Sequence, residues 1–513
     1  MMKQRKKWGQ AMRCCRRWLK LALIGICATV PISVFAGGFT VGDQGARTAG
    51  RAGATVARAD DLSAIEYNPA GLAKLGQTRF HLGNRFGYVN EDFKRAPLYD
   101  WTKLDDNGVP DYVRFKTVSN ETPWQLLNPM LVAATNFGLE NWGFALGVYA
   151  PQGVRNQKFP YAIGDPNQDK LDGGSRYMLT KRVVNLAYYD LSVAWKYKDI
   201  FGIGASLQWV DLASVELQLV VDGTTIPGMA NPVVSDYDML VSLKGADHIG
   251  GSAIIGAWFK PKPYLEIGLS GRVIPVRLNA DCKLSVKPIT LTSDEPPEMT
   301  RNNRKADDVK LSFTLPVTAR LGVRYIHLDG DTPLFDLELD FVYESYHMTD
   351  AYDIDGNGLN VSIIGQEVPV DHIVLPKNWR DTFSVRLGGD YNLAPDLFSI
   401  RAGAFYESAA RKEEYSFVDF YAGHRLGGSL GASVMFKGFD ISLSYTYIFE
   451  FPITVSETEG RVYQQVPGSR CQPPYDSTTT CHDNYLNQPA PVANAGTYVS
   501  SYHLTSLSVS YGF

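Results

Sequence analysis

The last part of the chain alternates strictly between large apolar and small polar residues. Apolar side chains recur at every odd position from Leu507 to Phe513, and Ser506, Ser508 and Ser510 alternate with them. In a β-strand this spacing puts all the apolar groups on one face. A soluble protein rarely leaves such a strand at its terminus, because an apolar edge promotes aggregation. In a transmembrane β-barrel the apolar face meets lipid, the polar face meets the lumen, and the edge pairs with the first strand.

Thirteen earlier segments are also predicted to be strands. The connections between the segments are long and short in strict alternation, beginning with 89–129 and 138–141. Outer-membrane barrels have short periplasmic turns and long outer loops, whereas a soluble β-sandwich has no reason to sort its loops in this way. We therefore predict an all-β transmembrane protein, a 14-stranded antiparallel outer-membrane barrel of residues 78–513 with both termini in the periplasm. The predicted strands are Thr78–Tyr88, Met130–Phe137, Trp142–Tyr149, Val183–Tyr197, Phe201–Val220, His248–Phe259, Leu265–Val273, Leu311–His327, Leu334–Tyr346, Trp379–Tyr391, Leu397–Glu407, Gly427–Phe436, Phe439–Phe449 and Tyr502–Phe513.

The composition agrees with a barrel and excludes a helical membrane protein. Charged residues make up 20% of the 513 residues, and the mean hydropathy is −0.15. Outside the N-terminal region there is no apolar run of about 18 residues, so no transmembrane helix is predicted. Aromatic residues make up 12% of the chain, which suits β-strands and the aromatic belts of a membrane barrel.

Residues 1–36 have the organisation of a signal peptide. A cationic stretch from Lys3 to Lys20 precedes an apolar stretch from Leu21 to Phe35, and cleavage is predicted before Gly37. The pair Arg16-Arg17 also resembles a twin-arginine signal. That route exports folded proteins, whereas a barrel has to cross the inner membrane unfolded, so we favour the general export route.

The charge of the mature chain argues against a nucleic-acid partner. Residues 1–36 hold eight cations and no anions, so their removal takes the formal net charge from −4 to −12. Proteins that bind nucleic acids present a basic surface to the phosphates. We therefore predict no nucleic-acid partner.

Three cysteines lie beyond residue 36. Cys471 and Cys481 are ten residues apart in a polar, proline-rich stretch, and a disulfide between them is predicted because an oxidising compartment favours disulfides. Cys282 is then left without a predicted partner. No pair of histidines has the spacing of metal ligands.

A short acidic stretch copies the first half of a calcium loop. Asp353, Asp355 and Asn357 have the spacing of the first three ligands, and Gly358 follows them. The twelfth position of such a loop needs Glu, and Ile364 stands there instead. The sequence leaves open a structural Ca²⁺ ion held by these residues or a simple turn rich in Asp, Asn and Gly. No other cofactor is predicted.

Charged side chains are predicted to line the lumen on neighbouring strands. Arg320 and Arg324 face an acidic row across one short turn, and Arg386 and Arg401 share the next pair of strands with acidic residues. Opposite charges on adjacent strands pair across a ladder, so we favour a structural ion-pair network. The alternative is that one of these arginines binds a ligand carboxylate. The acidic residues concerned are Asp336, Glu338, Asp340, Glu344, Asp390 and Glu407.

Residues 37–77 do not alternate and are rich in Gly, Ala, Asp and Arg. Asn68 followed by Pro69 has the character of the N-cap and first residue of a short helix, which Gly76 would end. A compact segment of small residues directly before the first strand can fold back into the lumen. We predict that it forms a plug, or hatch, inside the barrel.

Four motifs occur in this segment: Gly37-Gly38-Phe39, Gly50-Arg51-Ala52, Asp60-Asp61 and Asn68-Pro69-Ala70. In order and spacing they resemble the N-terminal hatch of the FadL/TodX family of outer-membrane transporters. The resemblance extends more faintly into the barrel region. Fourteen strands is also the strand number of that family.

The resemblance implies a function and a set of site residues. Members of the family carry long-chain fatty acids or, in some branches, aromatic hydrocarbons to a pocket inside the barrel, and a shift of the hatch releases them. The resemblance implies that Phe39 lies beside the pocket and leaves Arg320, Arg324, Arg386 and Arg401 as candidates for the ligand carboxylate. The hatch residues implied in gating are Gly50, Arg51, Asp60, Asp61, Asn68, Pro69 and Ala70.

The same resemblance implies a lateral exit near the third strand, Trp142–Tyr149. Gly143 and Gly147 fall on its lumen face, and Pro151 follows it. Glycine in a strand permits a kink or bulge, so both glycines are predicted to allow a lateral opening. The implied partners are a hydrophobic small molecule and outer-membrane lipid. The implied state is a monomer in the outer membrane of a Gram-negative bacterium.

Two other functions are kept as alternatives. A structural or adhesive barrel would bind a partner through its loops and keep its lumen sealed. An outer-membrane lipase would use Ser429, the serine of a Gly-x-Ser-x-Gly sequence at 427–431. A nucleophile elbow needs a strand, a sharp turn and a helix, and Ser429 lies in a predicted strand, so we predict that the protein is not an enzyme. No phosphate-binding loop is present, so uptake is expected by facilitated diffusion.

Overall fold

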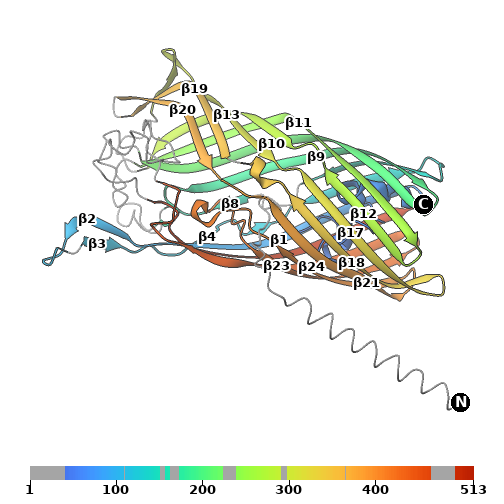
Figure 1. The fold of residues 1–513 in the computed structure, drawn as a ribbon. Coiled ribbons are helices and arrows are strands. Elements are labelled where there is room, and N and C mark those ends of the chain that lie inside the picture. The colour runs from blue at the N-terminus through green and yellow to red at the C-terminus, as the bar shows by residue number, and fades with distance from the viewer. Residues whose placement is uncertain are drawn as a thin grey trace. The chain divides into compact units, whose positions relative to one another are not determined.

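In the residues that it describes, the computed structural model of the protein consists almost entirely of β-strands (Figure 1). Fourteen of them pair antiparallel in chain order, and the last pairs with the first, so the sheet closes into a barrel. The predicted 14-stranded antiparallel barrel is therefore confirmed. The structure describes residues 41–108, 110–150, 156–161, 173–222, 238–289, 297–349, 351–363, 366–463 and 492–513.

The ladder between the last and the first strand closes the barrel. β25 (Gly496–Gly512) pairs with β1 (Arg79–Arg95) along the full length of both strands, as the alternation at the C-terminus predicts. The other strands of the ring are β6 (Pro129–Thr135), β7 (Trp142–Tyr149), β9 (Leu179–Tyr197), β10 (Phe201–Asp222), β11 (Asp238–Lys262), β12 (Leu265–Arg272), β17 (Thr318–Asp329), β18 (Thr332–Glu344), β21 (Thr382–Ala394), β22 (Phe398–Glu407), β23 (Arg425–Phe436) and β24 (Phe439–Val455).

Two features correct the predicted strand boundaries. The predicted strand Leu311–His327 is two strands, separated at Pro316, because proline has no N–H for the ladder. The connections predicted to be long loops also contain strands, some of which extend the barrel beyond the ring. The further elements are β2 (Leu98–Leu104), β3 (Pro110–Val113), β4 (Val118–Ser119), β5 (Trp124–Gln125), β8 (Asn156–Lys158), β13 (Val276–Pro288), β14 (Met299–Arg301), β15 (Arg304–Lys305), β16 (Asp308–Leu315), β19 (Ala351–Ile363), β20 (Gln366–Pro376) and the 3-10 helices η2 (Tyr346–Met348) and η3 (Glu413–Tyr415).

The part of the barrel nearest the short turns is apolar outside and polar inside. Leu430, Leu443 and Leu507 are 66%, 53% and 45% exposed on the outer face, whereas Ser506 and Ser508 are buried on the lumen face. A lipid bilayer requires this arrangement of a barrel wall. Within the described ranges of the chain, no helix combines the length and hydropathy needed to cross a membrane.

The polarity of the two faces reverses toward the end of the barrel opposite the short turns, which we call the long-loop end. Near the middle of β10, Leu207 points outward and Gln208 inward. The register of the ladder then shifts around Leu212. Beyond the shift, Glu216 points outward and Leu217 is buried inside. The outer face therefore meets water at the long-loop end, and the inner face is free to be apolar.

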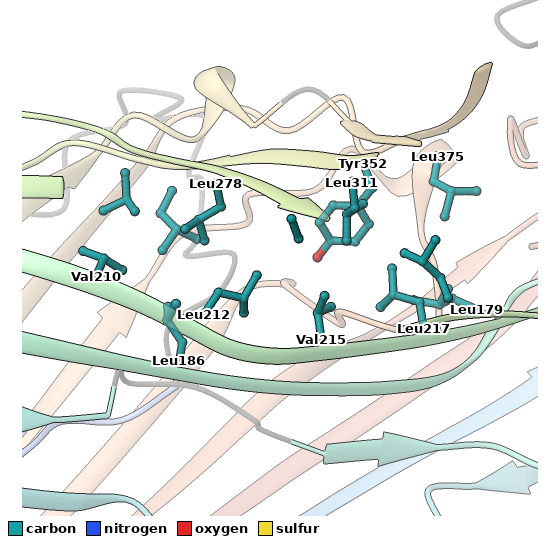
Figure 2. Close-up of a cluster of buried hydrophobic side chains, with 14 of the residues drawn as sticks. Leu179, Leu186, Val210, Leu212, Val215, Leu217, Leu278, Leu311, Tyr352 and Leu375 are labelled. Atoms are coloured by element: carbon teal, nitrogen blue, oxygen red, sulfur yellow. The ribbon is translucent and has the colours of Figure 1, made fainter. Parts of the chain in front are cut away.

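The reversal produces an apolar interior at the long-loop end. Figure 2 shows part of it, with Leu212, Val215 and Leu217 of β10 on one side and Leu278 of β13 and Leu311 of β16 on the other. The other buried residues of this cluster come mainly from residues 59–75 and from β9, β10, β13 and β19. A lumen lined in this way can hold an apolar molecule away from water.

Cys282 lies on the inner face of β13 and is a buried free thiol. Burial raises the pKa of this thiol to about 12, so the reactive thiolate is scarce near neutral pH. We expect thiol reagents at pH 8 to leave Cys282 unmodified in the folded protein and to modify it in denaturant, as peptide mass mapping would show. Rapid modification of the folded barrel would contradict the burial of β13.

Residues 41–77, which we call the plug, lie inside the ring of strands. They form α2 (Ala46–Ala49), α3 (Ala64–Tyr67) and the 3-10 helix η1 (Pro69–Lys74), and most of their side chains are buried. α2 contacts β23, β24 and β25, whereas η1 contacts β7, β9, β10 and β11. A segment that touches such different parts of the ring fills the lumen. The boundary of the hatch at residue 37 and that of the signal peptide lie outside the described residues and stay predictions.

Candidate functional site

A cavity of about 320 Å³ lies in the apolar interior, and we call it the chamber. The plug borders it, because Gln44 donates a hydrogen bond at 2.8 Å to the carbonyl oxygen of Ala150, which lines the cavity. β9, β10 and β16 supply half of the apolar and aromatic lining residues. The apolar and aromatic lining residues include Leu186, Tyr188, Val215, Leu217, Leu311, Phe313, Leu315, Tyr352 and Phe420.

Arg272, the last residue of β12, provides a cation in the chamber wall. Its guanidinium carbon lies 4.9 Å from the ring centroid of Tyr188. Its Nε is buried and has no hydrogen-bond partner among the described residues, and no ion pair within 4.0 Å joins it to a described carboxylate. A guanidinium prefers a planar carboxylate as its partner. Arg272 is therefore a candidate for binding an anionic group inside the chamber.

Two other charged residues line the chamber. Arg182 lies over the ring of Phe420, with 4.0 Å between its guanidinium carbon and the ring centroid, and donates to Gln157 at 2.6 Å. Glu344 accepts a weak hydrogen bond from Thr382 at 3.5 Å. The guanidinium of Arg182 thus has a side-chain acceptor in Gln157, whereas the Nε of Arg272 has no hydrogen-bond partner among the described residues.

The chamber also reaches the lipid-facing surface of the barrel. Leu127, Leu131 and Val148 line it and are 64%, 50% and 37% exposed on the outside of the barrel. Leu131 lies on β6. Val148 lies on β7, the third strand of the barrel, next to the long-loop end of that strand. The cavity is therefore continuous, through apolar side chains, from the interior to the outer wall.

The four arginines predicted as ligand candidates do not line the chamber. Instead, each is held by the plug or by acidic residues on neighbouring strands, as expected where opposite charges alternate across a ladder. Arg320 donates to the carbonyl oxygen of Glu66 at 2.9 Å, Arg324 pairs with Asp336 at 2.6 Å and Glu266 at 3.0 Å, Arg386 pairs with Asp43 at 3.0 Å and Glu407 at 3.2 Å, and Arg401 pairs with Asp390 at 3.3 Å.

Arg51 of the plug lies at the centre of a buried ionic cluster. Its guanidinium is 2.6 Å from Asp336, 2.7 Å from Asp390 and 3.2 Å from Glu338. Glu338 also accepts the backbone N–H of Ala57 at 2.6 Å. The acidic row on β18 therefore holds the backbone and the side chain of the plug together. An unpaired charge at this depth would be costly, so the plug is fixed at this point.

The other predicted gating residues also contact the plug or the wall. Asp60 pairs with Arg58 at 3.0 Å, and Asp61 accepts the backbone N–H of Ser63 at 2.8 Å. Gly50 lies so close to Arg401 that a Cβ atom would meet its side chain at 2.8 Å. These residues shape the plug and its fit to the wall.

Asn68 organises the turn between α3 and η1. Its side chain donates to the carbonyl oxygens of Val56 at 2.8 Å and Ala257 of β11 at 3.0 Å, and it accepts the backbone N–H of Ala70 at 3.2 Å. Pro69 follows as the first residue of η1. One side chain therefore links the plug turn to the plug itself and to the barrel wall.

Glycines on the lumen face leave space for the plug turn at 68–70 to approach the wall. The sequence analysis did not single out most of these glycines. A Cβ atom on Gly204 of β10 would collide with the backbone of Pro69 and Ala70, and one on Gly256 of β11 would collide with Asn68. The sequence signal is a glycine at a lumen-facing position of a strand. Such positions mark where the plug backbone approaches the wall most closely.

Gly143 and Gly147 of β7 serve the same purpose. A Cβ atom on Gly143 would overlap the backbone of Leu72, and one on Gly147 would meet the side chain of Ile65 at 2.7 Å. β7 pairs with β6 and β9 without a register shift. The structure thus shows that both glycines contact the plug and that β7 has no bulge at either of them. The chamber reaches the outer wall near them, beside Val148.

Some of the predicted site residues lie outside the described residues, and others are described but are not arranged around a metal ion. Phe39, Cys471 and Cys481 lie outside the described residues, so their roles stay predictions. Asp353, Asp355 and Asn357 lie in β19, where Asp355 accepts the backbone N–H of Asn357 at 2.8 Å. The described part of the chain holds no group of three or more His, Cys, Asp or Glu residues placed to bind a metal ion. Calcium binding at this turn stays an untested prediction.

Ser429 lies within β23 and has no strand-to-helix turn around it. Its hydroxyl lies 2.9 Å from that of Thr446 on the next strand, on the lumen face. A nucleophile elbow would hold the serine on a sharp turn above a sheet. The geometry at Ser429 is that of a lumen-facing strand residue.

Comparison with known proteins places this architecture in a family. The sequence matches, over residues 27–482, the family described as outer membrane protein transport protein (OMPP1/FadL/TodX). An outer membrane protein of Neisseria meningitidis serogroup B is 23% identical over 443 residues, which cover 84% of this chain and 89% of that protein.

Two solved structures share the fold. A FadL homologue of Pseudomonas aeruginosa has a TM-score of 0.69 at 17% identity, covering 93% of this chain and 100% of that one. The toluene transporter TodX of Pseudomonas putida has a TM-score of 0.59 at 14% identity, covering 92% and 98%. The chain therefore belongs to the OMPP1/FadL/TodX family of outer-membrane transporters of hydrophobic compounds.

Proposed function

We propose that the protein carries long-chain fatty acids across the outer membrane by facilitated diffusion. The observation that supports this most directly is the apolar chamber that holds Arg272, a cation whose buried Nε has no hydrogen-bond partner among the described residues. An alkyl chain gains about 0.8 kcal/mol for each CH₂ group removed from water. A carboxylate gains charge-assisted hydrogen bonds from a guanidinium. A fatty acid carries both of these groups.

The position of the chamber supports a route through the wall. We propose that the long-loop end faces the outside of the cell and that both termini lie in the periplasm. A molecule in the chamber can then pass over the long-loop ends of β6 and β7, beside Leu131 and Val148, into the bilayer. It would avoid the transfer of apolar surface into water that an open aqueous pore would require. A sealed structural or adhesive barrel has no use for such a cavity.

The plug is proposed to control release. A long alkyl chain binds tightly to an apolar cavity, so transport needs a change that weakens binding. The plug borders the chamber through Gln44 and is fixed to the wall by Arg51 and Asn68. A shift of the turn at 68–70 would alter the base of the chamber. In this proposal Gly50, Asp60 and Asp61 keep the plug in the shape that fits the wall.

Replacement of Arg272 by methionine tests the proposed function. We expect palmitate to bind the purified barrel about ten- to a hundredfold more weakly, because a hydrogen bond to a charged group contributes about 1.5–3 kcal/mol. Binding of the neutral alcohol of the same chain length should stay the same. Displacement of a fluorescent fatty acid in detergent would measure both affinities, and uptake by cells that lack another fatty-acid transporter would measure transport.

Arg277 offers a matched control for this substitution. It lies on the exposed outer face of β13, so Arg277→Met removes the same charge without touching the chamber. Palmitate affinity should be unchanged in this variant. An equal loss of acid and alcohol binding in Arg272→Met would show a packing defect. Unchanged acid binding would count against a carboxylate site at Arg272.

Aromatic hydrocarbons are the second candidate substrates. Tyr188, Tyr352 and Phe420 line the chamber, and Glu344 places a carboxylate in the same wall, which disfavours an anion there. The solved structures that share this fold include transporters described as acting on toluene. In the experiment above, a toluene affinity that exceeds the palmitate affinity and is unchanged by Arg272→Met would favour this function.

A further inference from the structure

A second cavity lies on the outer face of the barrel, and we call it the wall groove. It has a volume of about 960 Å³ and is lined by residues of β25, β1, β6, β7, β9 and β10. Leu146, Leu191 and Leu207 lie opposite one another on three neighbouring strands and are 63%, 57% and 65% exposed. Ligand sites typically have volumes of about 300–1,000 Å³, so the wall groove is large enough to hold a ligand.

The side chains along one row of the wall explain why the surface is hollow. Ala133 of β6 lies between Phe80 of β1 and Leu146 of β7 in the register of the sheet. A small residue between two large ones leaves a depression in an otherwise convex wall. The depression faces lipid, because the leucines that line it belong to the apolar outer surface.

The wall groove begins where the chamber reaches the lipid-facing surface. Leu131 and Val148 line both cavities. Val148 lies two residues from Leu146 along β7, which is a separation of about 7 Å in a strand. A molecule that leaves the chamber over the ends of β6 and β7, beside Leu131 and Val148, therefore meets the wall groove first.

Aromatic residues mark the end of the groove nearest the long-loop end. Tyr189 and Trp209 stack with ring centroids 4.9 Å apart, and the indole N–H of Trp209 donates to the carbonyl oxygen of His248 at 2.6 Å. Such rings with polar tips belong at the membrane–water interface of a barrel. From this level the groove runs along the apolar wall, which suits an alkyl chain whose polar end stays at the interface.

We propose that the wall groove is a second binding site, which takes the alkyl chain of a fatty acid that has just left the chamber. This inference rests on the proposed function. Release then has two steps, from the chamber to the wall groove and from there to the bilayer. In each step the chain moves between apolar surroundings, so neither step exposes the whole chain to water.

Site-specific photo-crosslinking tests the proposal. Benzoylphenylalanine would replace Leu146 in the wall groove, Leu217 in the chamber or, as a control, Leu430 on β23, which is 66% exposed and lines neither cavity. The full chain would be folded into vesicles of phosphatidylethanolamine and phosphatidylglycerol and given radiolabelled palmitate. We expect several-fold more labelling at 146 than at 430. Leu186→Trp, which fills the chamber, should lower labelling at 146, and Arg272→Met serves as a second way to empty the chamber.

Each other outcome overturns the inference. Equal labelling at 146 and 430 would show ordinary contact with palmitate dissolved in the bilayer. Labelling at 146 that ignores both chamber variants would show a site filled from the bilayer, and a crosslink to a second protein chain would show an interface between copies. Labelling at 217 without labelling at 146 would contradict the wall groove as a binding site and leave the proposed function intact. A lack of labelling at 217 would count against the proposed function itself.

Discussion

Replacement of Arg51 by methionine is expected to detach the plug from the wall while the barrel stays folded. Arg51 is 1% exposed and contacts Asp336, Asp390 and Glu338. Removal of one partner from a buried ionic cluster typically costs about 3–5 kcal/mol. The carboxylate of Glu338 would be destabilised most, because it would lose Arg51, its ion-pair partner among the described residues. It would keep backbone donors such as Ala57, which do not balance a charge.

Two measurements separate loss of the plug from loss of the barrel. Cells that make Arg51→Met should become sensitive to a large hydrophilic antibiotic that an intact outer membrane excludes. The purified barrel should still migrate as a folded species on an unheated gel. Arg304→Met, a change on the exposed strand β15, should leave both results unchanged. The double variant Arg51→Met with Glu338→Gln should recover part of the resistance, because it removes both charges of the pair. Equal resistance in the Arg51 and Arg304 variants would contradict a fixing role for Arg51.

The sequence predicts the ring of strands well because the bilayer imposes one rule on it. Every strand in the apolar band must alternate between lipid and lumen, and Leu507 with Ser508 shows the rule in its simplest form. β13 also alternates perfectly from Val276 to Val286, yet this stretch lies in a connection between two of the predicted strands, Leu265–Val273 and Leu311–His327. The alternation there has the opposite polarity, with Leu278 inside and Arg277 outside. A reversal of polarity is the sequence signal for a barrel that continues beyond the membrane.

The functional residues were harder to find from the sequence. The rows of charge that include Arg324 and Arg401 attract attention because they are repeated, and the repetition itself means that each charge has a partner. Arg272 is a single residue at the end of a strand, and only the closed barrel brings it to Tyr188 and the chamber. An isolated charge carries no periodic signal. Its significance appears only when the fold shows that its buried Nε has no hydrogen-bond partner among the described residues.

The second large effect is expected from Gly204→Ala. A Cβ atom on Gly204 would lie 2.5 Å from the backbone nitrogen of Ala70 and 2.6 Å from the carbonyl carbon of Pro69. Backbone atoms cannot rotate away, so the plug turn has to move, at a cost of about 1–3 kcal/mol for an overpacked site. We expect hydrogen exchange of the peptide 64–74 to rise about five- to a hundredfold, because exchange follows the free energy of local opening.

Gly428→Ala is the matched control, because a Cβ atom there would have no other atom within 4 Å. It should leave the exchange of 64–74 unchanged. If the plug turn controls release, palmitate uptake should rise in Gly204→Ala together with the exchange, since the variant weakens the seated state and leaves Arg272 and the chamber walls untouched. Faster exchange with unchanged uptake would mean that the turn opens without controlling transport. Unchanged exchange would mean that the plug turn can shift away from β10 at no cost, so the close contact at Gly204 would have no part in holding it.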